Sequence, residues 1–429
     1  MKKLLLTLSC AFFNLTAYSA VPLNAEQQLG EALFKDKNLS FNHNQSCETC
    51  HSLNPIPSLK GVQGIVAGFV DPSNVKGIAP ISVGSIPRTT GTLNAPSIAY
   101  SSYSPEFGWD EDEKIYVGGQ FWNGRASNLI EQAKKPLLNP VEMAMLDELD
   151  VVNRVKSNPK YIKDFQKIYQ LNISDTSSDK AVQDTYTALA KAISAFEQSG
   201  VFNKFNSKFD YYLAGTTQLS AVEKKGLDLF QGKAGCSGCH KMDVTVDSNG
   251  VTTPPLFTYF GYDNIGLPRN VTITGNPVAD LGLGGREGIP QTEIGKHKVR
   301  TLRNIDLTPP YGHNGIFKTL DDMVHFYNTR DVLKKVKDNN SPEFAKTAWA
   351  PPEIASNINT TQIGNLGLTV TEEKAIVAFL KTLTDDYPLW ANNTAVIETK
   401  DERVKEDSAP PVISPKSMPR LGIPVRMKK

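Results

Sequence analysis

Apolar side chains recur at helical spacing in several separated stretches of the chain, which predicts an architecture built mainly of helices. Residues Glu26–Phe34 and Glu223–Phe230 both place Leu and Phe on one face of an amphipathic helix. Residues Asp184–Ser199 form a third amphipathic pattern, ended by Gly200. Because the first two stretches repeat each other, the pattern indicates two related modules with a boundary just after the third helix.

Two further helices are predicted in the second half of the chain. Residues Thr319–Tyr327 form a capped helix that begins at Thr319 and Asp322. One face of this helix carries Leu320, Val324 and Tyr327. Residues Thr371–Thr382 form a closing helix with three apolar side chains directed inward, namely Ile376, Phe379 and Leu380.

Strand patterns are few, and irregular segments are long. Residues 54–98 are rich in Gly, Pro and Ser, which predicts loop rather than regular structure. Beyond Tyr387 the chain is rich in proline and lysine and shows no periodicity, so residues 388–429 are predicted to be a wrapped strap or a disordered tail. The fold class is therefore mainly α with long irregular loops.

The beginning of the chain indicates export. Lys2 and Lys3 precede an apolar run from Leu4 to Ala17 and then small residues, which is typical of a signal peptide over residues 1–19. No later segment approaches about 20 consecutive apolar residues. We therefore expect a periplasmic protein that is not an integral membrane protein, with an N-terminal domain over residues 20–200 and a C-terminal domain over residues 201–387.

The charge balance excludes some partners. The 429 residues include 46 basic and 45 acidic side chains, so almost no net charge remains. A chain with this charge balance has no excess of positive charge for sequence-independent binding to nucleic acid or to anionic lipid. No nucleic acid is expected among the partners.

Four of the five cysteines form two CxxCH motifs, while Cys10 lies in the signal peptide. This motif attaches c-type haem through two thioethers and places the adjacent histidine as an axial iron ligand. The alternatives are disulfides or a zinc site. Two copies in an exported chain predict two covalently bound haem c groups, held by Cys47, Cys50, His51, Cys236, Cys239 and His240.

The chemistry of each haem depends on the iron coordination position opposite the histidine. A protein ligand in that position favours electron transfer, whereas an empty position permits reaction with peroxide. No histidine occurs between His51 and His240, so the first module can recruit only His43, upstream of its own motif. We expect His43 to be a surface or loop residue. The first haem is therefore predicted to have an open or weakly filled distal side.

Several segments resemble the bacterial dihaem cytochrome c peroxidase and MauG family over nearly the whole chain to about Asp386. The most specific is FWNGRASNLIEQAKKPLLNPVEM at Phe121–Met143. Similar too are LSFNHNQSCETCH, LNAPS at Leu93–Ser97 and LRNIDLTPPYGHNG at Leu302–Gly315. The resemblance implies two cytochrome c-like haem domains.

The same resemblance implies roles at the first haem. Glu142 matches the distal carboxylate, and cleavage of a peroxide O–O bond needs a group that moves a proton between the two oxygens. From the residues alone, a helix start after Pro140 is the favoured interpretation of Glu142, and the resemblance reverses it. Gln132 matches a residue lining the same pocket, and Trp122 matches the tryptophan between the two haems, although an indole can also be simply a core side chain.

Further roles at the domain junction are implied by the resemblance. One Ca²⁺ would bind the Asn94 side chain and the backbone carbonyls of Thr308 and Pro310, since oxygen ligands suit this ion. Arg125 and Arg303 could pair with haem propionates or form surface ion pairs. We expect His313 to be a hydrogen-bonding residue near the second haem.

The second haem carries the clue that separates the branches of the family. At the position of Tyr327 the resemblance implies methionine in the peroxidases and tyrosine in the MauG branch. An anionic phenolate lowers the reduction potential that a thioether raises. Tyr327 is therefore predicted to ligate the second iron; Met323 or His325 could do so instead, or Tyr327 could be only a core aromatic.

Three functions follow from this reading. The first is an enzyme that reacts with hydrogen peroxide and oxidises Trp or Tyr on a partner protein. The second is an ordinary peroxidase that takes electrons from a small redox protein, a cytochrome or a copper protein. The third is a dihaem electron carrier. Tyr327, and the lack of histidine in the loop from Ser52 to Thr92, favour the first.

Overall fold

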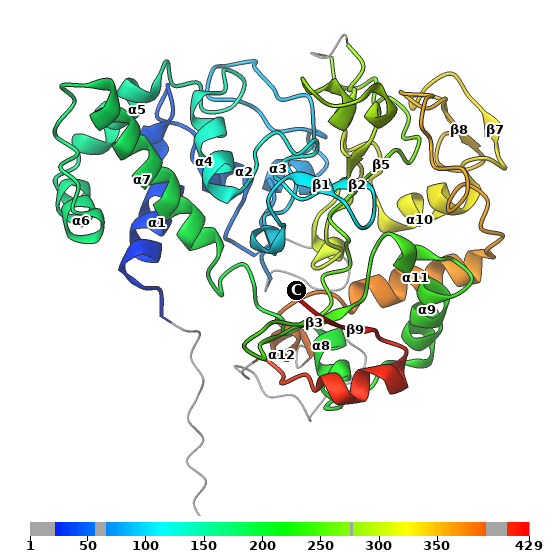
Figure 1. Ribbon diagram of the computed structural model, residues 1–429. Coiled ribbons are helices and arrows are strands. Elements are labelled where there is room, and N and C mark those ends of the chain that lie inside the picture. Colours follow the sequence, from blue (N-terminus) through cyan, green and yellow to red (C-terminus); the bar gives the residue numbers. More distant parts are fainter. Residues whose placement is uncertain (1–21, 56–65, 275–277, 392–409, 429) are drawn as a thin grey trace, which may run out of the picture.

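The computed structural model describes residues 22–55, 66–274, 278–391 and 410–428 (Figure 1), so the expected signal peptide lies outside the described residues. The described chain is mainly helical, as predicted. Its α-helices are α1 Ala25–Lys35, α2 Cys47–Cys50, α3 Pro72–Val75, α4 Leu129–Leu138, α5 Glu148–Lys156, α6 Pro159–Tyr169, α7 Asp179–Glu197, α8 Lys208–Leu213, α9 Ala221–Gln231, α10 Leu320–Thr329, α11 Val370–Lys381 and α12 Tyr387–Ala391.

The strands of the described residues are short and form four small sheets. β1 pairs antiparallel with β2, and β5 with β6, whereas β7 pairs parallel with β8. The remaining sheet has the order β4-β3-β9. The strands are β1 Gly108–Asp110, β2 Ile115–Val117, β3 Val244–Val246, β4 Thr252–Thr253, β5 Tyr262–Asp263, β6 His297–Lys298, β7 Lys334–Lys335, β8 Ala348–Trp349 and β9 Val425–Met427.

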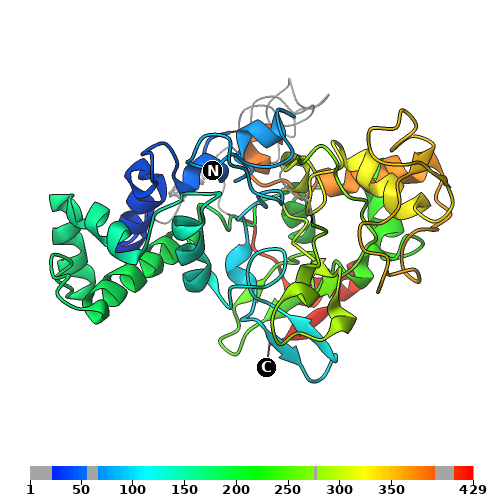
Figure 2. The same cartoon turned by 90° about the horizontal axis from the view of Figure 1, so that it is seen from above.

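Two crossed helix pairs repeat the same packing. In the first, α1 lies against α7, and a side chain at Gly30 would place its Cβ 1.9 Å from the carbonyl oxygen of Ala192. In the second, α9 lies against α11, and a Cβ at Gly226 would lie 1.9 Å from the carbonyl oxygen of Ala375. Only glycine permits these approaches. Figures 1 and 2 show the two pairs on opposite sides of the molecule.

Each helix pair belongs to its own hydrophobic core. The buried apolar residues of the first core come from residues 29–202, and those of the second from residues 209–423. Both cores bury large aromatic side chains at the helix crossings: Phe34 and Phe196 in the first, Phe230 and Phe379 in the second. This duplication is the structural counterpart of the repeat in the sequence.

The predicted helices are present, with shifts at their ends. The helix expected from Asp184 begins five residues earlier, because Ser178 caps it by accepting a hydrogen bond from the backbone of Ala181. The capping box of Thr319 and Asp322 at the start of α10 is confirmed. The inward side chains of α11 are buried as expected: Ile376, Phe379 and Leu380.

The C-terminal segment packs against the second core. Over residues 410–428 it forms a 3-10 helix at Pro415–Leu421 and then β9, which pairs parallel with β3 (Figure 1). Met418 and Ile423 are buried in the second core. Of the two alternatives for the tail, a wrapped strap is the correct one for these residues, whereas residues 392–409 lie outside the described chain.

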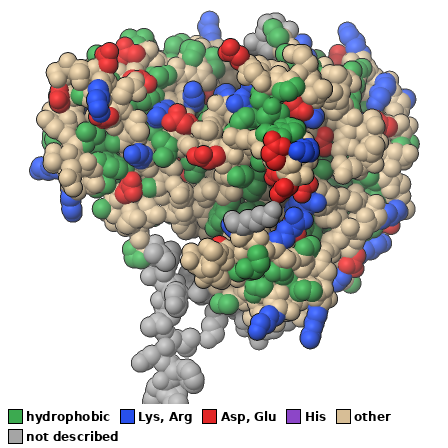
Figure 3. Space-filling model, viewed as in Figure 1, with side chains coloured by type: hydrophobic (Ala, Val, Ile, Leu, Met, Phe, Trp, Pro, Cys, Tyr) green, Lys and Arg blue, Asp and Glu red, His purple; other side chains and the backbone are tan. Residues whose placement is uncertain are grey.

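The surface matches the balanced composition. On the face shown in Figure 3, basic and acidic side chains are interspersed. Within the described residues, no helix combines the length and the apolar character needed to cross a bilayer.

Candidate active site

A cavity of about 540 Å³ lies beside α2, α4 and α7. This volume is in the usual range for small-molecule and cofactor sites. The cavity brings together residues that are far apart in the sequence and that were all predicted for the first haem: Cys47, Cys50, His51, Trp122, Gln132 and Glu142. Arg125 and Asn94 also line it.

His51 and His240 are held in the same way. The ring Nδ1 of His51 lies 3.3 Å from the carbonyl oxygen of Phe69, and that of His240 lies 2.9 Å from the carbonyl oxygen of Phe257. Burial lowers the pKa of both histidines to about 4, so both rings are neutral near pH 7. An Nδ1–H donated to a carbonyl leaves Nε2 with a lone pair, which is the form that ligates a metal.

The cysteines of both motifs are free thiols. All four lie in the described residues, and none forms a disulfide. The disulfide alternative is therefore wrong. The zinc alternative also lacks support, because the one metal-binding group found among the described residues lies elsewhere, at Asp280, His297 and His313. The thiols and the two neutral imidazoles fit covalently bound haem.

Glu142 lies in a turn after α4 rather than at the start of a helix, so the helix-start alternative is wrong. The chain leaves α4 at Asn139, whose side chain donates a 2.7 Å hydrogen bond to Oε1 of Glu142. Burial raises the pKa of Glu142, while Arg125 and the bond from Asn139 act in the opposite direction. The result is a partly desolvated carboxyl that is better suited to exchange a proton than an exposed one.

Gln132 and Arg125 complete the wall beside Glu142. The side-chain oxygen of Gln132 is buried and has no hydrogen-bond partner among the described residues, so it is available to a ligand. The Arg125 guanidinium lies 3.5 Å from the centre of the Phe121 ring. Its position is compatible with the expected pairing with a haem propionate, which stays a prediction.

Trp122 lines this cavity and also a second one. Asp280 and Arg300 likewise line both cavities. The indole Nε1 donates a 2.9 Å hydrogen bond to the carbonyl oxygen of Asn94. Arg300, which the sequence reasoning did not single out, donates to the carbonyl oxygen of Ser97 at 2.8 Å. The three side chains form the partition between the two cavities.

The second cavity is smaller, about 190 Å³, and contains the second motif and the face of α10. Cys236, His240, Met323 and Tyr327 all line it. His325 points elsewhere, with Nδ1 3.0 Å from Glu373, so it is wrong as a ligand. This volume lies below the usual range for a cofactor site. The observation that supports a haem here is therefore the set of lining side chains that could bind it, namely the Cys236 thiol, the His240 imidazole and the Tyr327 phenol.

Tyr327 needs a cation to become a phenolate. Burial raises its pKa well above the ordinary value, and the negative charge is disfavoured further by Cys239, Cys236 and Asp263 if they ionise. A ferric iron next to the phenol would reverse this balance.

Three expectations for other side chains are corrected or settled. Arg303 is fully buried and forms a bidentate pair with Asp210 at 2.8 and 2.9 Å, so it serves neither a haem propionate nor the surface. His313 lines the second cavity as expected, but its Nε2 has no hydrogen-bond partner among the described residues. His43 is exposed beside Asn38 and Arg154, as expected.

Asn94 is suitably oriented for the expected calcium site. It is 7% exposed, and its side-chain nitrogen donates to the carbonyl oxygen of Pro80, so its Oδ1 remains as a ligand atom. Its backbone nitrogen donates to the carbonyl oxygen of His313 at 2.8 Å, which ties it to the segment that contains Thr308 and Pro310. The calcium ion itself stays a prediction.

Sequence reasoning missed a second acid in the first cavity, Glu197 of α7. It is 4% exposed, its Oε2 has no hydrogen-bond partner among the described residues, and burial raises its pKa to about 8. Glu197 follows Phe196 at the first helix crossing just as Leu380 follows Phe379 at the second. Aligning the two modules on these helices would have revealed an acid where the other cavity has leucine.

Replacing Glu197 by Gln is expected to stabilise the protein increasingly as the pH rises. The folded-state pKa of about 8 lies above the ordinary 4.5, so the folded chain binds more protons and loses stability across this window. The loss is at most about 1.4 kcal/mol per pH unit. Melting temperatures of parent and variant should diverge between about pH 5 and about pH 8. Glu131→Gln, whose side chain is on the solvent-facing side of α4, is the control, and a constant difference across this range would contradict the assignment.

Comparison with known proteins places the chain in a family. Residues 24–218 match the family model for di-haem cytochrome c peroxidase. The chain is 36% identical to the methylamine utilization protein MauG of Paracoccus denitrificans over 379 residues, which cover 86% of this chain and 91% of that protein. It is 31% identical to the cytochrome c551 peroxidase of Nitrosomonas europaea over 374 residues, covering 86% and 83%.

A solved structure supports the same assignment. The diheme peroxidase BthA of Burkholderia thailandensis has a TM-score of 0.69 and 26% identity, with 91% of each chain covered. The chain therefore belongs to the dihaem cytochrome c peroxidase and MauG family, and the predicted fold of two cytochrome c-like haem domains is confirmed. It is a peroxidase-type oxidoreductase with two haem cofactors.

Proposed function

We propose that the chain is a periplasmic enzyme in which hydrogen peroxide reacts in the first cavity beside Glu142, and in which the oxidising equivalents oxidise a partner protein. The observation that carries this proposal is the arrangement of Glu142, Trp122 and Tyr327. An acid lines the first cavity, an indole lines both cavities, and a phenol lines the second.

The chain's residues would hold the two haems in matching ways. The thiols of Cys47 and Cys50 in the domain of residues 20–200, and of Cys236 and Cys239 in the domain of residues 201–387, would form the thioether links. His51 and His240 would present Nε2 to iron while their Nδ1–H groups remain hydrogen-bonded to carbonyls. Haem iron would supply the redox chemistry that cleaves the peroxide O–O bond.

Glu142 moves the proton in this scheme. Its raised pKa keeps it able to accept a proton from one peroxide oxygen and to return it to the other. Asn139 fixes one carboxylate oxygen by a hydrogen bond, which leaves the other for the substrate. Gln132 offers a buried acceptor on the same wall that can orient the peroxide O–H.

Trp122 lies between the two cavities, and Tyr327 lines the second. The indole of Trp122 is fixed by its hydrogen bond to Asn94, and calcium bound by Asn94, Thr308 and Pro310 would fix this junction further. Tyr327 would ligate the second iron as a phenolate and lower the reduction potential of that haem. A haem of low potential can share an oxidising equivalent, and this supports oxidation of Trp or Tyr on a partner protein.

An ordinary peroxidase is the second candidate. The observation in its favour is that Met323 lines the same cavity as Tyr327, one helical turn earlier on α10. Thioether ligation by Met323 would raise the potential of the second haem and suit electron entry from a small cytochrome or copper protein.

The test is to add peroxide to the fully oxidised, haem-loaded protein and to follow the haem absorption spectrum. The proposal predicts a spectral change without prior reduction, a slow return, and faster return when a protein bearing exposed Trp and Tyr is present. Rapid consumption of peroxide with reduced cytochrome c, and no lasting spectral change without it, would establish the ordinary peroxidase. If peroxide never changes the haem spectrum, both enzyme functions are excluded and the protein is a dihaem electron carrier.

A further inference from the structure

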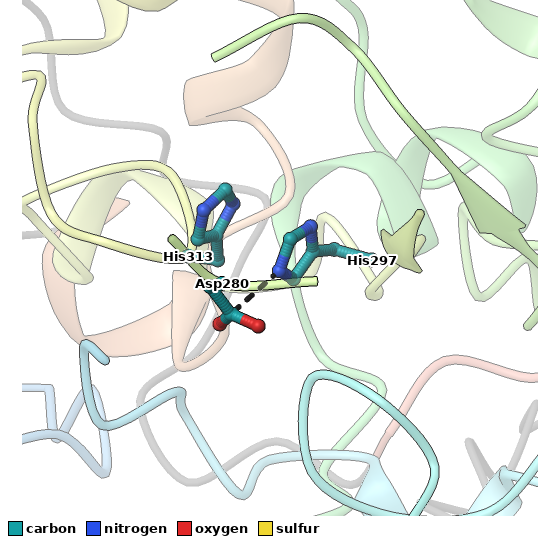
Figure 4. A group of neighbouring side chains, drawn as sticks. All are labelled: Asp280, His297 and His313. Carbon is teal, nitrogen blue, oxygen red and sulfur yellow. Dashed lines mark ion pairs between the residues drawn. The ribbon is translucent and has the colours of Figure 1, made fainter. Parts of the chain in front are cut away.

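A cluster of two histidines and an aspartate lies at the partition between the two cavities. Asp280, His297 and His313 all line the second cavity, and Asp280 lines the first as well. One ligand atom from each lies within 4.8 Å of the others. Figure 4 shows the Asp280 carboxylate next to both rings, with one nitrogen of His297 facing it. Neither Asp280 nor His297 was singled out by the sequence.

The two imidazole rings are stacked, and the Nε2 atom of each lies near a carboxylate without a hydrogen bond to it. The ring centres lie 3.6 Å apart at an interplanar angle of 5°. Among the described residues, neither Nε2 atom has a hydrogen-bond partner, although the side chains are only 10% and 7% exposed. Buried polar atoms of this kind are rare in proteins unless they meet a water, an ion or another ligand.

The hydrogen bonding around the cluster prepares it for a cation. Nδ1 of His297 lies 3.1 Å from the carbonyl oxygen of Gly295, which can only accept a hydrogen bond, so Nδ1 carries a hydrogen and Nε2 is the ring atom left to face a ligand. That Nε2 lies 3.4 Å from Oδ2 of Asp280, too far for a hydrogen bond of normal length. The backbone nitrogen of Gly282 donates to the other carboxylate oxygen at 2.8 Å and orients Asp280.

A second carboxylate stands behind the first. Oε2 of Glu353 lies 3.9 Å from Nε2 of His313, and Glu353 is buried in the wall of the same cavity. Two imidazole nitrogens thus face one oxygen of each of two carboxylates, while the other oxygen of Glu353 accepts from the backbone nitrogen of Asp280 and pairs with Arg269. A bound cation could contact both nitrogens and both of these facing oxygens at once, which a single proton cannot do.

We propose that Asp280, His297 and His313 form a binding site for a divalent transition-metal ion such as Zn²⁺, with Glu353 as a further ligand or an outer carboxylate. Two imidazole nitrogens and one carboxylate are a donor set typical of zinc, and a carbonyl that accepts from the other ring nitrogen is the usual support for a ligating histidine. The donor set differs from the all-oxygen set expected for calcium at Asn94. The site lines the cavity that would hold the second haem, so its test uses the haem-loaded protein and measures metal binding rather than activity.

The test measures zinc bound by the full, haem-loaded protein after treatment with a chelator and restoration of calcium. Equilibrium dialysis with metal analysis should give one zinc ion per chain. His297→Ala and Asp280→Ala should each weaken this binding by at least about 100-fold, whereas His43→Ala, which removes an exposed histidine, should not change it. X-ray absorption at the zinc edge should show only nitrogen and oxygen ligands.

The haem content of each variant establishes that it has folded, so a loss of zinc alone is informative. The proposal is overturned if the parent protein binds no zinc at micromolar concentrations, which would indicate that the two Nε2 atoms donate to haem carboxylates instead. It is also overturned if His297→Ala binds zinc as the parent does, or if His43→Ala loses binding equally.

Discussion

Replacing Glu142 by glutamine is expected to slow the reaction of the oxidised protein with hydrogen peroxide by about 100- to 10,000-fold, the usual contribution of a positioned acid–base group. The amide keeps the shape of the side chain and can still bond to Asn139, but it cannot take up a proton. Stopped-flow absorption gives the second-order rate constant directly. The haem spectrum before peroxide is added should be unchanged.

Glu131→Gln is the matched control, because Glu131 lies on the neighbouring helix α4 and pairs with Lys134 at the surface. Its rate constant should equal that of the parent. If Glu142→Gln reacts within a few-fold of the parent rate, Glu142 is not the proton-transferring group, and another acid of the cavity, first of all Glu197, must be considered.

Replacing Tyr327 by methionine is expected to raise the reduction potential of the second haem by on the order of 100 mV, a fraction of the roughly 0.8 V over which axial ligands tune haem iron. The physical reason is the loss of an anionic oxygen ligand in a buried cavity. A spectroelectrochemical titration that resolves the two haems measures the shift. In the same variant, the spectral change caused by peroxide should have a shorter lifetime.

Met323→Leu is the matched variant on the same face of α10. With Tyr327 as the ligand, this change leaves the potential of the second haem within a few tens of mV. A large shift in Met323→Leu together with a small one in Tyr327→Met would assign the ligand to Met323 and would favour the ordinary peroxidase.

Local patterns predicted much of the fold. Helical spacing of Leu and Phe located α1 and α9, and the cap residues Thr319 and Asp322 located the start of α10. These features depend on neighbours within a few residues, so a single sequence reveals them. The haem motifs were visible for the same reason, since their cysteines and histidine are adjacent along the chain.

Features that depend on distant segments were not predictable in this way. Arg303 was expected at a haem or at the surface, but it meets Asp210, which lies 93 positions earlier, inside the protein. The sequence does not decide between a strap and a disordered tail, because β9 gains its partner, β3, only through folding. His297 and His313 likewise stack only because the loop between them folds back and brings the two rings together between the cavities.

The role of Glu142 came from a motif rather than from local chemistry. From its neighbours alone, a glutamate after Pro140 is best interpreted as a helix-start residue, and that interpretation proved wrong because the chain turns at Asn139. Glu197 was missed for the opposite reason. Its helix is amphipathic and regular, and nothing in the local pattern shows that this acid faces a cavity.

We infer that the first haem has no protein side chain as an iron ligand on the side of Glu142. Among the described residues, His51 is the only histidine lining that cavity. Resonance Raman spectroscopy of the oxidised and the reduced protein reports the coordination number of each haem through its marker bands. We expect one haem to have a single protein ligand in each state and to bind added cyanide as a further ligand. Two haems that each keep two protein ligands in both states, and that do not bind cyanide, would contradict it.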